Sequence, residues 1–164
     1  MALFSGTHHM QFDVKGRVSI PAPFRVALRE SSSVASLPMP VSIPLILRPH
    51  MTEPCIEAWT EHRFEALQAS LDKFDPLSPE RDALALVVFG DAHTMETDRE
   101  GRIVIDPFLL THSGLTRARA NGVAYVGLGT GFQIWEPEAL AARKAQARAV
   151  YQGSQPRLRE TAAP

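Results

Sequence analysis

Two short segments of the sequence combine an aspartate, a glycine and an arginine at the same spacing. Residues 13 to 17 read DVKGR, and residues 98 to 102 read DREGR. A carboxylate at the start of such a segment can accept hydrogen bonds from the backbone amides that follow, and the glycine can adopt a positive φ without a steric clash. We therefore predict two hairpin turns, formed by Asp13 and Gly16 and by Asp98 and Gly101.

The arginine that ends each segment could serve two purposes. A guanidinium can donate two parallel hydrogen bonds to O6 and N7 of guanine, and it also pairs with phosphate. The same side chain could instead return to the aspartate of its own turn as an internal ion pair. The residues alone leave both roles open for Arg17 and Arg102, and the two roles are compatible.

The charge of the chain is unevenly distributed. The net charge is only −1, which by itself disfavours a nucleic-acid partner because phosphate neutralisation needs local Lys and Arg. Residues 53 to 97 hold ten acidic and three basic residues, so the remainder carries a net charge of +6. That positive charge lies near both turns and in the C-terminal stretch, which makes a basic face opposite an acidic one feasible.

The two turns belong to a longer internal repeat. DVKGRVSI at residues 13 to 20 matches DREGRIVI at residues 98 to 105, and the apolar segments that follow end in CIEAW and FQIW. Each copy is predicted to contain a strand, the turn, a strand, a short helix opened by proline, two more strands and a longer helix. The first copy is longer, and we expect its extra residues, Ser31 to Ser42, to form a loop.

Helix signals divide the chain further. A first helix, which Pro76 ends, is predicted by the apolar spacing of Phe64, Leu67, Leu71 and Phe74. A second helix is predicted to begin after its N-cap Ser78 and to run to Gly90. A third is predicted to start at Pro137 and to end near Gly153. We therefore expect a first repeat with its trailing helix at 4–76, a connecting helix at 77–91, a second repeat with a C-terminal helix at 92–152 and a disordered tail at 153–164.

Several function classes lack their sequence signals. No apolar run is long enough for a transmembrane helix, no hydrolase, metalloprotease or Walker motif occurs, and the single Cys55 removes every paired-cysteine zinc pattern. With 45% hydrophobic and 21% charged residues, the composition is typical of a globular protein. We expect a cytoplasmic protein that is not an enzyme and has no metal, no cofactor, no membrane association and no small-molecule substrate.

The paired motifs DVKGRVSIP and DREGRIVID, with CIEAW and FQIW closing the two copies, resemble the MraZ family from Phe4 to about Val150. The resemblance implies an α+β fold made of two tandem AbrB-like, swapped-hairpin β-modules that form a small barrel with flanking short helices. It further implies ring-shaped homo-oligomers associated with the nucleoid. These would bind G-rich direct repeats of double-stranded DNA in the promoter of the division and cell-wall gene cluster, usually as a repressor.

Carried onto this sequence, the resemblance implies that Asp13, Gly16, Asp98 and Gly101 form the turns and that Lys15, Arg17, Arg99 and Arg102 contact DNA. Two features depart from the family pattern. Glu100 stands where the first turn has Lys15, so we expect the two copies to contact DNA unequally, and the Pro-rich insertion is longer. The alternative hypothesis is an oligomeric protein-interaction scaffold with structural arginines and no sequence-specific DNA binding.

Overall fold

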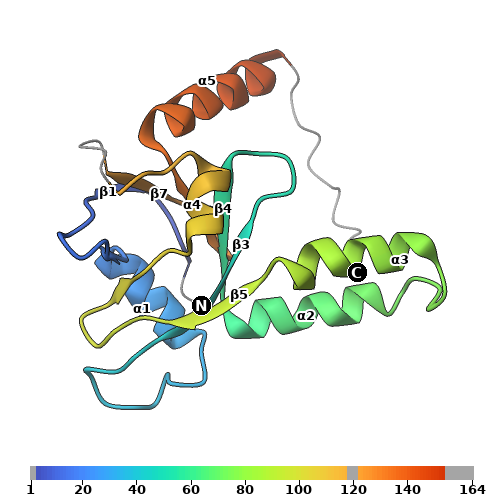
Figure 1. The fold of residues 1–164 in the computed structure, drawn as a ribbon, viewed down its shortest axis with the longest axis horizontal. Coiled ribbons are helices and arrows are strands. Elements are labelled where there is room, and N and C mark those ends of the chain that lie inside the picture. Colours follow the sequence, from blue (N-terminus) through green and yellow to red (C-terminus); the bar gives the residue numbers. More distant parts are fainter. Residues whose placement is uncertain (1–2, 118–121, 154–164) are drawn as a thin grey trace, which may run out of the picture.

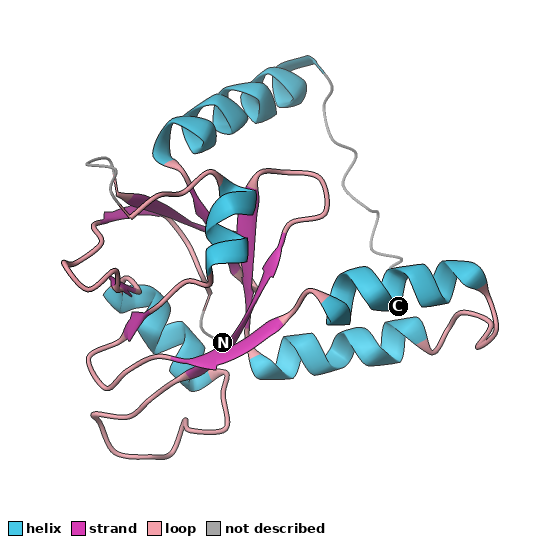
Figure 2. Ribbon diagram, viewed as in Figure 1, coloured by secondary structure: helices cyan, strands magenta, loops and turns pink. Residues whose placement is uncertain are grey.

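The computed structural model describes residues 3–117 and 122–153 and shows an α+β protein, in which strands gather in the middle and helices lie around them (Figures 1 and 2). The strands are β1 (Thr7–Met10), β2 (Val18–Ser19), β3 (Pro44–Pro49), β4 (Cys55–Trp59), β5 (His93–Glu96), β6 (Arg102–Ile103), β7 (Val123–Gly127) and β8 (Phe132–Trp135). The helices are α1 (Ala22–Glu30), α2 (Glu61–Leu71), α3 (Pro79–Ala85), the π-helical η1 (Leu86–Gly90), α4 (Pro107–Ser113) and α5 (Pro137–Gly153).

The two copies of the repeat exchange their first strands. The six-stranded sheet has the order β1-β7-β8-β4-β3-β5, so β1 of the first copy pairs with β7 of the second, and β5 of the second copy pairs with β3 of the first. The pairing also matches in register, because His8 lies opposite Tyr125 as His93 lies opposite Leu47. Each copy therefore completes the sheet of the other.

Two further strand pairs, β4–β8 and β2–β6, join equivalent strands across the approximate two-fold axis that relates the copies. Equivalent strands β4 and β8 pair antiparallel with Glu57 opposite Gln133, and equivalent strands β2 and β6 pair with Val18 opposite Ile103. Glu57 and Gln133 are 76 residues apart and Val18 and Ile103 are 85 apart, as in the sequence repeat, so in each strand pair one residue lies opposite its own counterpart. The small β2–β6 ribbon is separate from the larger sheet.

An aromatic cluster joins the two copies in the core. Phe4 and Phe24 come from the first copy, Tyr125 and Phe132 come from the second, and at most 2% of each side chain is exposed. The ring of Phe132 lies 5.2 Å from Phe4, 5.0 Å from Phe24 and 5.9 Å from Tyr125. Burial of four large rings drives association because each removes extensive apolar surface from water.

Helices α1, α3, α4 and α5 begin at or next to the prolines that predicted them, whereas α2, for which no start was predicted, ends at Leu71, before Pro76. The side-chain oxygens of Thr60, Ser78 and Asp106 accept hydrogen bonds from the first turns of α2, α3 and α4. Such caps satisfy amides that have no partner within the helix. Helices α2 and α3 lie side by side and project to the right in Figure 1, whereas α1 lies to the left. The expected loop between Ser31 and Ser42 is confirmed.

The α+β class is confirmed, but the expected closed barrel does not form among the described residues. Strands β1 and β5 are the two edges of the six-stranded sheet and do not pair with each other, so the sheet stays open. Helix α3 also changes to π-helical geometry at Leu86 before the predicted end at Gly90. Within residues 3–117 and 122–153, every helix is too short or too polar to cross a lipid bilayer. The predicted tail falls largely on residues 154–164, which lie outside the described residues.

Candidate nucleic-acid interface

The first turn is held by the carboxylate of Asp13. Its Oδ1 accepts the backbone N–H groups of Lys15 at 3.0 Å and Arg17 at 2.9 Å, and its Oδ2 accepts Nε of Arg17 at 2.7 Å. Gly16 adopts a φ of +76° and donates its N–H to the carbonyl of Asp13. The predicted hairpin turn is confirmed, and so is the internal ion pair that the sequence left open.

The second turn repeats this arrangement. The carboxylate of Asp98 accepts the backbone N–H groups of Glu100 at 3.0 Å and Arg102 at 2.8 Å, and it accepts Nε of Arg102 at 2.7 Å. Gly101 adopts a φ of +81°. Two segments 85 residues apart thus build the same turn with distances that agree within 0.1 Å.

The hydrogen bonds inside each turn affect the acidity of both aspartates. Hydrogen bonds from the backbone and side chain of Arg17 lower the pKa of Asp13. Partial burial would raise the pKa of Asp98, but hydrogen bonds from the backbone and side chain of Arg102 outweigh it and lower that pKa. Both aspartates are therefore anionic at neutral pH, and they hold the arginines by charge-assisted hydrogen bonds.

The guanidinium groups are tethered but not enclosed. The side chains of Arg17 and Arg102 are each 28% exposed, because Asp13 and Asp98 engage only the Nε side of the fork. The tether removes freedom from a long side chain, so an arginine held in this way would bind a partner with a smaller loss of conformational entropy.

The β2–β6 ribbon joins the two turns at one place on the surface. Ser19 lies opposite Arg102, and the N–H of Ile20 donates to the carbonyl of Gly101. Arg102 has a raised pKa, chiefly because of its hydrogen bond to Asp98, and Asp13 of the other turn contributes through space. The two turns therefore share one electrostatic environment.

Two further arginines, not predicted as site residues from the sequence, cross between the copies. The side chain of Arg25 from the first copy lies over Gly101, and its Nη1 donates to the carbonyl of Glu100 at 2.7 Å. Arg117 of the second copy lies over Gly16 and donates to the carbonyl of Ile105 at 2.9 Å. Their positions depend on the packing of one copy against the other, so no local sequence pattern could have identified them.

The resulting surface is basic. Lys15 and Arg99 are exposed at the tips of the two turns, beside the other four cationic side chains. The six basic residues face three carboxylates, so the surface carries a net charge of +3; its members are Lys15, Arg17, Arg25, Arg99, Arg102 and Arg117, with Asp13, Asp98 and Glu100. This assembly, called the paired-turn surface below, suits a polyanionic partner.

The glycine of the first turn leaves room for the side chain of Arg117, and this can be tested by substitution. In Gly16→Ala, the new Cβ would lie 2.7 Å from Cδ of Arg117 in a backbone with positive φ, so Arg117 must move. Gly129 has a φ of +83° and open space around it, so Gly129→Ala is a control that introduces the backbone strain alone. We expect Gly16→Ala to lower the free energy of unfolding by about 1–3 kcal/mol.

Urea denaturation of the two variants measures this difference. The loss for Gly16→Ala should exceed that for Gly129→Ala by about 1 kcal/mol, the usual net contribution of a hydrogen bond such as that from Arg117 to Ile105. Equal losses in the two variants would show that the contact of Arg117 with the first turn contributes nothing to stability.

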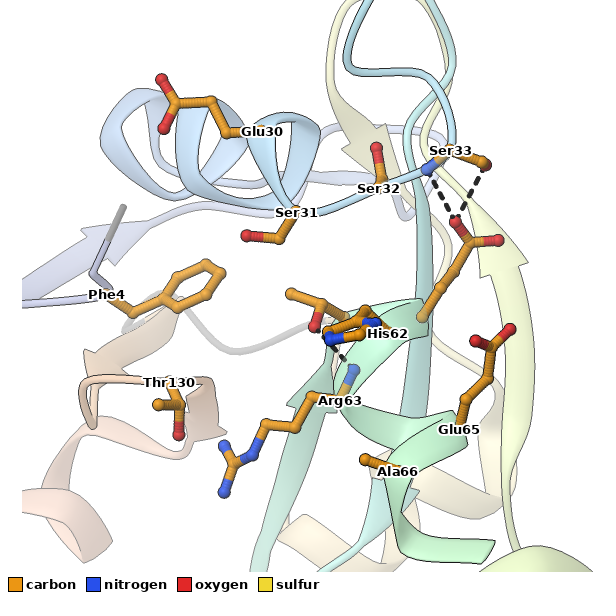
Figure 3. Close-up of a pocket in the computed structure, with 12 residues that line it drawn as sticks. Phe4, Glu30, Ser31, Ser32, Ser33, His62, Arg63, Glu65, Ala66 and Thr130 are labelled. Atoms are coloured by element: carbon orange, nitrogen blue, oxygen red, sulfur yellow. Dashed lines mark hydrogen bonds between the residues drawn. The ribbon is translucent and has the colours of Figure 1, made fainter. Parts of the chain in front are cut away.

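A pocket of about 780 Å³ lies elsewhere, between the end of α1 and the start of α2 (Figure 3). Some of its polar groups bond to one another: Glu61 accepts hydrogen bonds from the N–H and Oγ of Ser33, and Thr60 accepts one from the N–H of Arg63. The guanidinium of Arg63 lies 4.2 Å from the centre of the Trp59 ring. Three glutamates line this pocket, so it does not suit phosphate.

The histidines of the repeat do not form a metal site. His8 packs edge-on against Phe24 with 5.0 Å between ring centres, and His93 stacks on Phe108 at 6.2 Å. Within the described ranges, no three His, Cys, Asp or Glu side chains gather closely enough to hold a metal ion.

Known proteins resemble this chain over most of its length. The sequence profile of the family described as "MraZ protein" matches residues 3–39. "Transcriptional regulator MraZ" from Gluconobacter oxydans (strain 621H) is 45% identical over 90% of this chain and 84% of that relative, and the protein of the same name from Gluconacetobacter diazotrophicus is 45% identical over 90% and 87%. The one from Parvibaculum lavamentivorans is 35% identical over 99% of this chain and 94% of the relative.

Proposed function

This chain belongs to the MraZ family, and we propose that it is a sequence-specific DNA-binding transcriptional regulator that contacts DNA through the paired-turn surface. The family establishes a role in transcription regulation. The observation that carries the more specific proposal is the joining of two identical arginine turns by the β2–β6 ribbon at one basic surface. A fork of donors held at a surface turn suits the acceptor pairs of guanine and the oxygens of phosphate.

The residues of the two turns divide into three roles in this proposal. Arg17 and Arg102 contact base edges, while Lys15 and Arg99 at the exposed tips contact phosphates. Asp13, Gly16, Asp98 and Gly101 hold the turns. Phosphate contacts set the register of a protein on DNA, and base contacts provide sequence preference, so both kinds are needed for specific binding.

The distribution of charge over the molecule supports the same orientation. Helices α2 and α3 carry an excess of acidic residues and project away from α1, whose Arg25 reaches the second turn (Figure 1). DNA would repel this helical hairpin and attract the paired-turn surface. The near-neutral net charge is therefore the sum of an acidic helical region and a basic surface.

We further propose the target and assembly that the family resemblance implies. The protein would bind G-rich direct repeats in the promoter of the division and cell-wall gene cluster as a repressor, within ring-shaped homo-oligomers in the cytoplasm at the nucleoid. It would need no cofactor and act on no small-molecule substrate, as a regulator and not an enzyme. In a ring, repeated surfaces would meet repeated sites, so modest affinity at each would suffice.

We also propose the modular division of the chain that the sequence suggests. The units would be AbrB-like repeats at 4–76 and 92–152 joined by the segment 77–91, with the tail beyond. The exchange of β1 and β5 between the copies supports this proposal, because swapped first strands are what a swapped-hairpin pair requires.

Binding to a duplex of G-rich direct repeats, compared with a shuffled duplex across salt concentrations, tests the proposed function. We expect tighter binding to the repeats, and we expect Lys15→Ala to reduce the slope of log K against log[salt] by about 1 while preserving sequence preference. Oligomers in light scattering without salt-sensitive duplex binding would contradict the proposal and favour a protein-interaction scaffold.

A further inference from the structure

The two turns differ at their second and third residues. Their hydrogen bonds and backbone angles agree closely, so backbone geometry cannot make them act differently. The third residue of the turn is Lys15 in the first copy and Glu100 in the second. The second residue also differs, as Val14 in the first copy and Arg99 in the second, so both side chains can affect DNA binding. Glu100 is the one that also contacts the arginine of its own turn.

Glu100 forms a hydrogen bond with one nitrogen of Arg102, the arginine of the second turn. Its Oε2 accepts a hydrogen bond from Nη2 of Arg102 at 2.6 Å, while Asp98 accepts from Nε of the same guanidinium. Arg102 is thus held by two carboxylates on different nitrogens. In the first turn, Asp13 takes only Nε of Arg17, and both Nη atoms have no hydrogen-bond partner in the described part of the chain.

The same carboxylate also changes the charge that DNA would meet. Glu100 is 69% exposed in its side chain, so it would face an approaching phosphate and repel it. A guanine or phosphate that binds through Nη2 of Arg102 must compete with Glu100 for that nitrogen. Lys15 at the equivalent position of the first turn attracts phosphate and leaves the outer edge of Arg17 open.

We infer that Glu100 is an intramolecular competitor for Arg102, so that the first turn reads the bases and the second turn contributes mainly to position. This inference rests on the proposed function and assigns unequal roles to the two copies. The ion pair between Glu100 and Arg102 contributes little free energy because it is exposed, so DNA can compete with Glu100 for the arginine. A single substitution at this position should therefore change DNA affinity without affecting the fold.

The test measures the affinity of full-length variants for the G-rich repeat duplex by fluorescence anisotropy. Glu100→Gln should bind about 3- to 10-fold more tightly than the wild type, since a neutral amide competes more weakly for Arg102 and does not repel phosphate. Glu80→Gln, which removes the same charge from α3, should bind as the wild type does. Arg102→Ala should weaken binding less than about threefold, whereas Arg17→Ala should weaken it at least about tenfold.

Two further variants show whether the effect acts through the arginines. The part of the Glu100→Gln gain that acts through Arg102 should disappear in the double variant Glu100→Gln/Arg102→Ala, which leaves only the gain from lost repulsion. Lys15→Glu should weaken binding by about tenfold by placing the same competitor beside Arg17. Thermal unfolding of every variant confirms that each remains folded.

The outcomes separate this inference from the proposed function. If the wild type prefers the repeat duplex but Glu100→Gln binds no more tightly, or if Arg102→Ala and Arg17→Ala cost the same, the competitor role is wrong and specific DNA binding stands. If the wild type does not distinguish the repeat duplex from a shuffled one, the proposed function itself fails.

Discussion

Arg17→Ala is expected to weaken binding to the G-rich repeat duplex by about tenfold to a hundredfold and to reduce the preference over a shuffled duplex. The variant removes the bidentate donor fork from the turn in which the Nη atoms of the arginine have no hydrogen-bond partner among residues 3–117 and 122–153. The turn itself should persist, because Asp13 keeps its hydrogen bonds to the backbone of Lys15 and residue 17. A gel-shift or anisotropy titration measures both affinities.

Two controls separate the fork from its charge. Arg17→Lys keeps the positive charge but not the planar pair of donors, so we expect it to retain part of the affinity and lose the base preference. Arg148→Ala removes one positive charge from α5, outside both turns, and should have a much smaller effect. The assignment of Arg17 as a base-reading residue is wrong if Arg17→Ala titrates as the wild type does.

Phe132→Ala is expected to have the largest effect on stability. It removes the ring that contacts Phe4 and Phe24 of the first copy and Tyr125 of the second. Truncation of a buried phenylalanine typically lowers the free energy of unfolding by about 3–5 kcal/mol, a large part of the stability of an ordinary domain. Phe108→Ala, which truncates a half-exposed ring, should cost less than about 1 kcal/mol.

The two tryptophans allow this prediction to test whether the copies unfold together. Trp59 ends β4 in the first copy, and Trp135 ends β8 in the second. In single-tryptophan variants, Phe132→Ala should shift the fluorescence transitions of both tryptophans to the same lower guanidinium concentration. If only the Trp135 transition shifted, the copies would be independent units and the exchange of β1 and β5 would not couple them.

Local signals allowed much of this fold to be predicted. Proline and N-cap residues predicted where α3, α4 and α5 begin, and the segments CIEAW and FQIW became β4 and β8 with the same bounds. These features depend on neighbouring residues, whose conformational preferences a sequence displays directly. The Asp-x-x-Gly turns were predictable for the same reason, since one carboxylate and one glycine define each of them.

The features that the residues alone could not predict depend on contacts between distant segments, and the exchange of first strands was expected only from the family resemblance. The exchange of β1 and β5 brings together strands more than a hundred residues apart in one case, and a pattern within each strand cannot specify its partner. The same exchange leaves the six-stranded sheet open, which corrects the expected barrel. Arg25 and Arg117 likewise reach the turns only because the copies pack together, and the contact of Glu100 with Arg102 depends on how two side chains orient.

Site-directed crosslinking measures most directly which face of the molecule meets DNA. Lys15→Cys and Leu77→Cys place a thiol at the tip of the first turn and at the 93%-exposed bend between α2 and α3. The native Cys55 should not interfere, because it is fully buried and burial raises the pKa of its thiol. Each variant would carry an azidophenacyl group and be irradiated on the G-rich repeat duplex. We predict crosslinks from position 15 that map to the repeats and none from position 77, whereas crosslinks from position 77 alone would contradict DNA binding by the paired-turn surface.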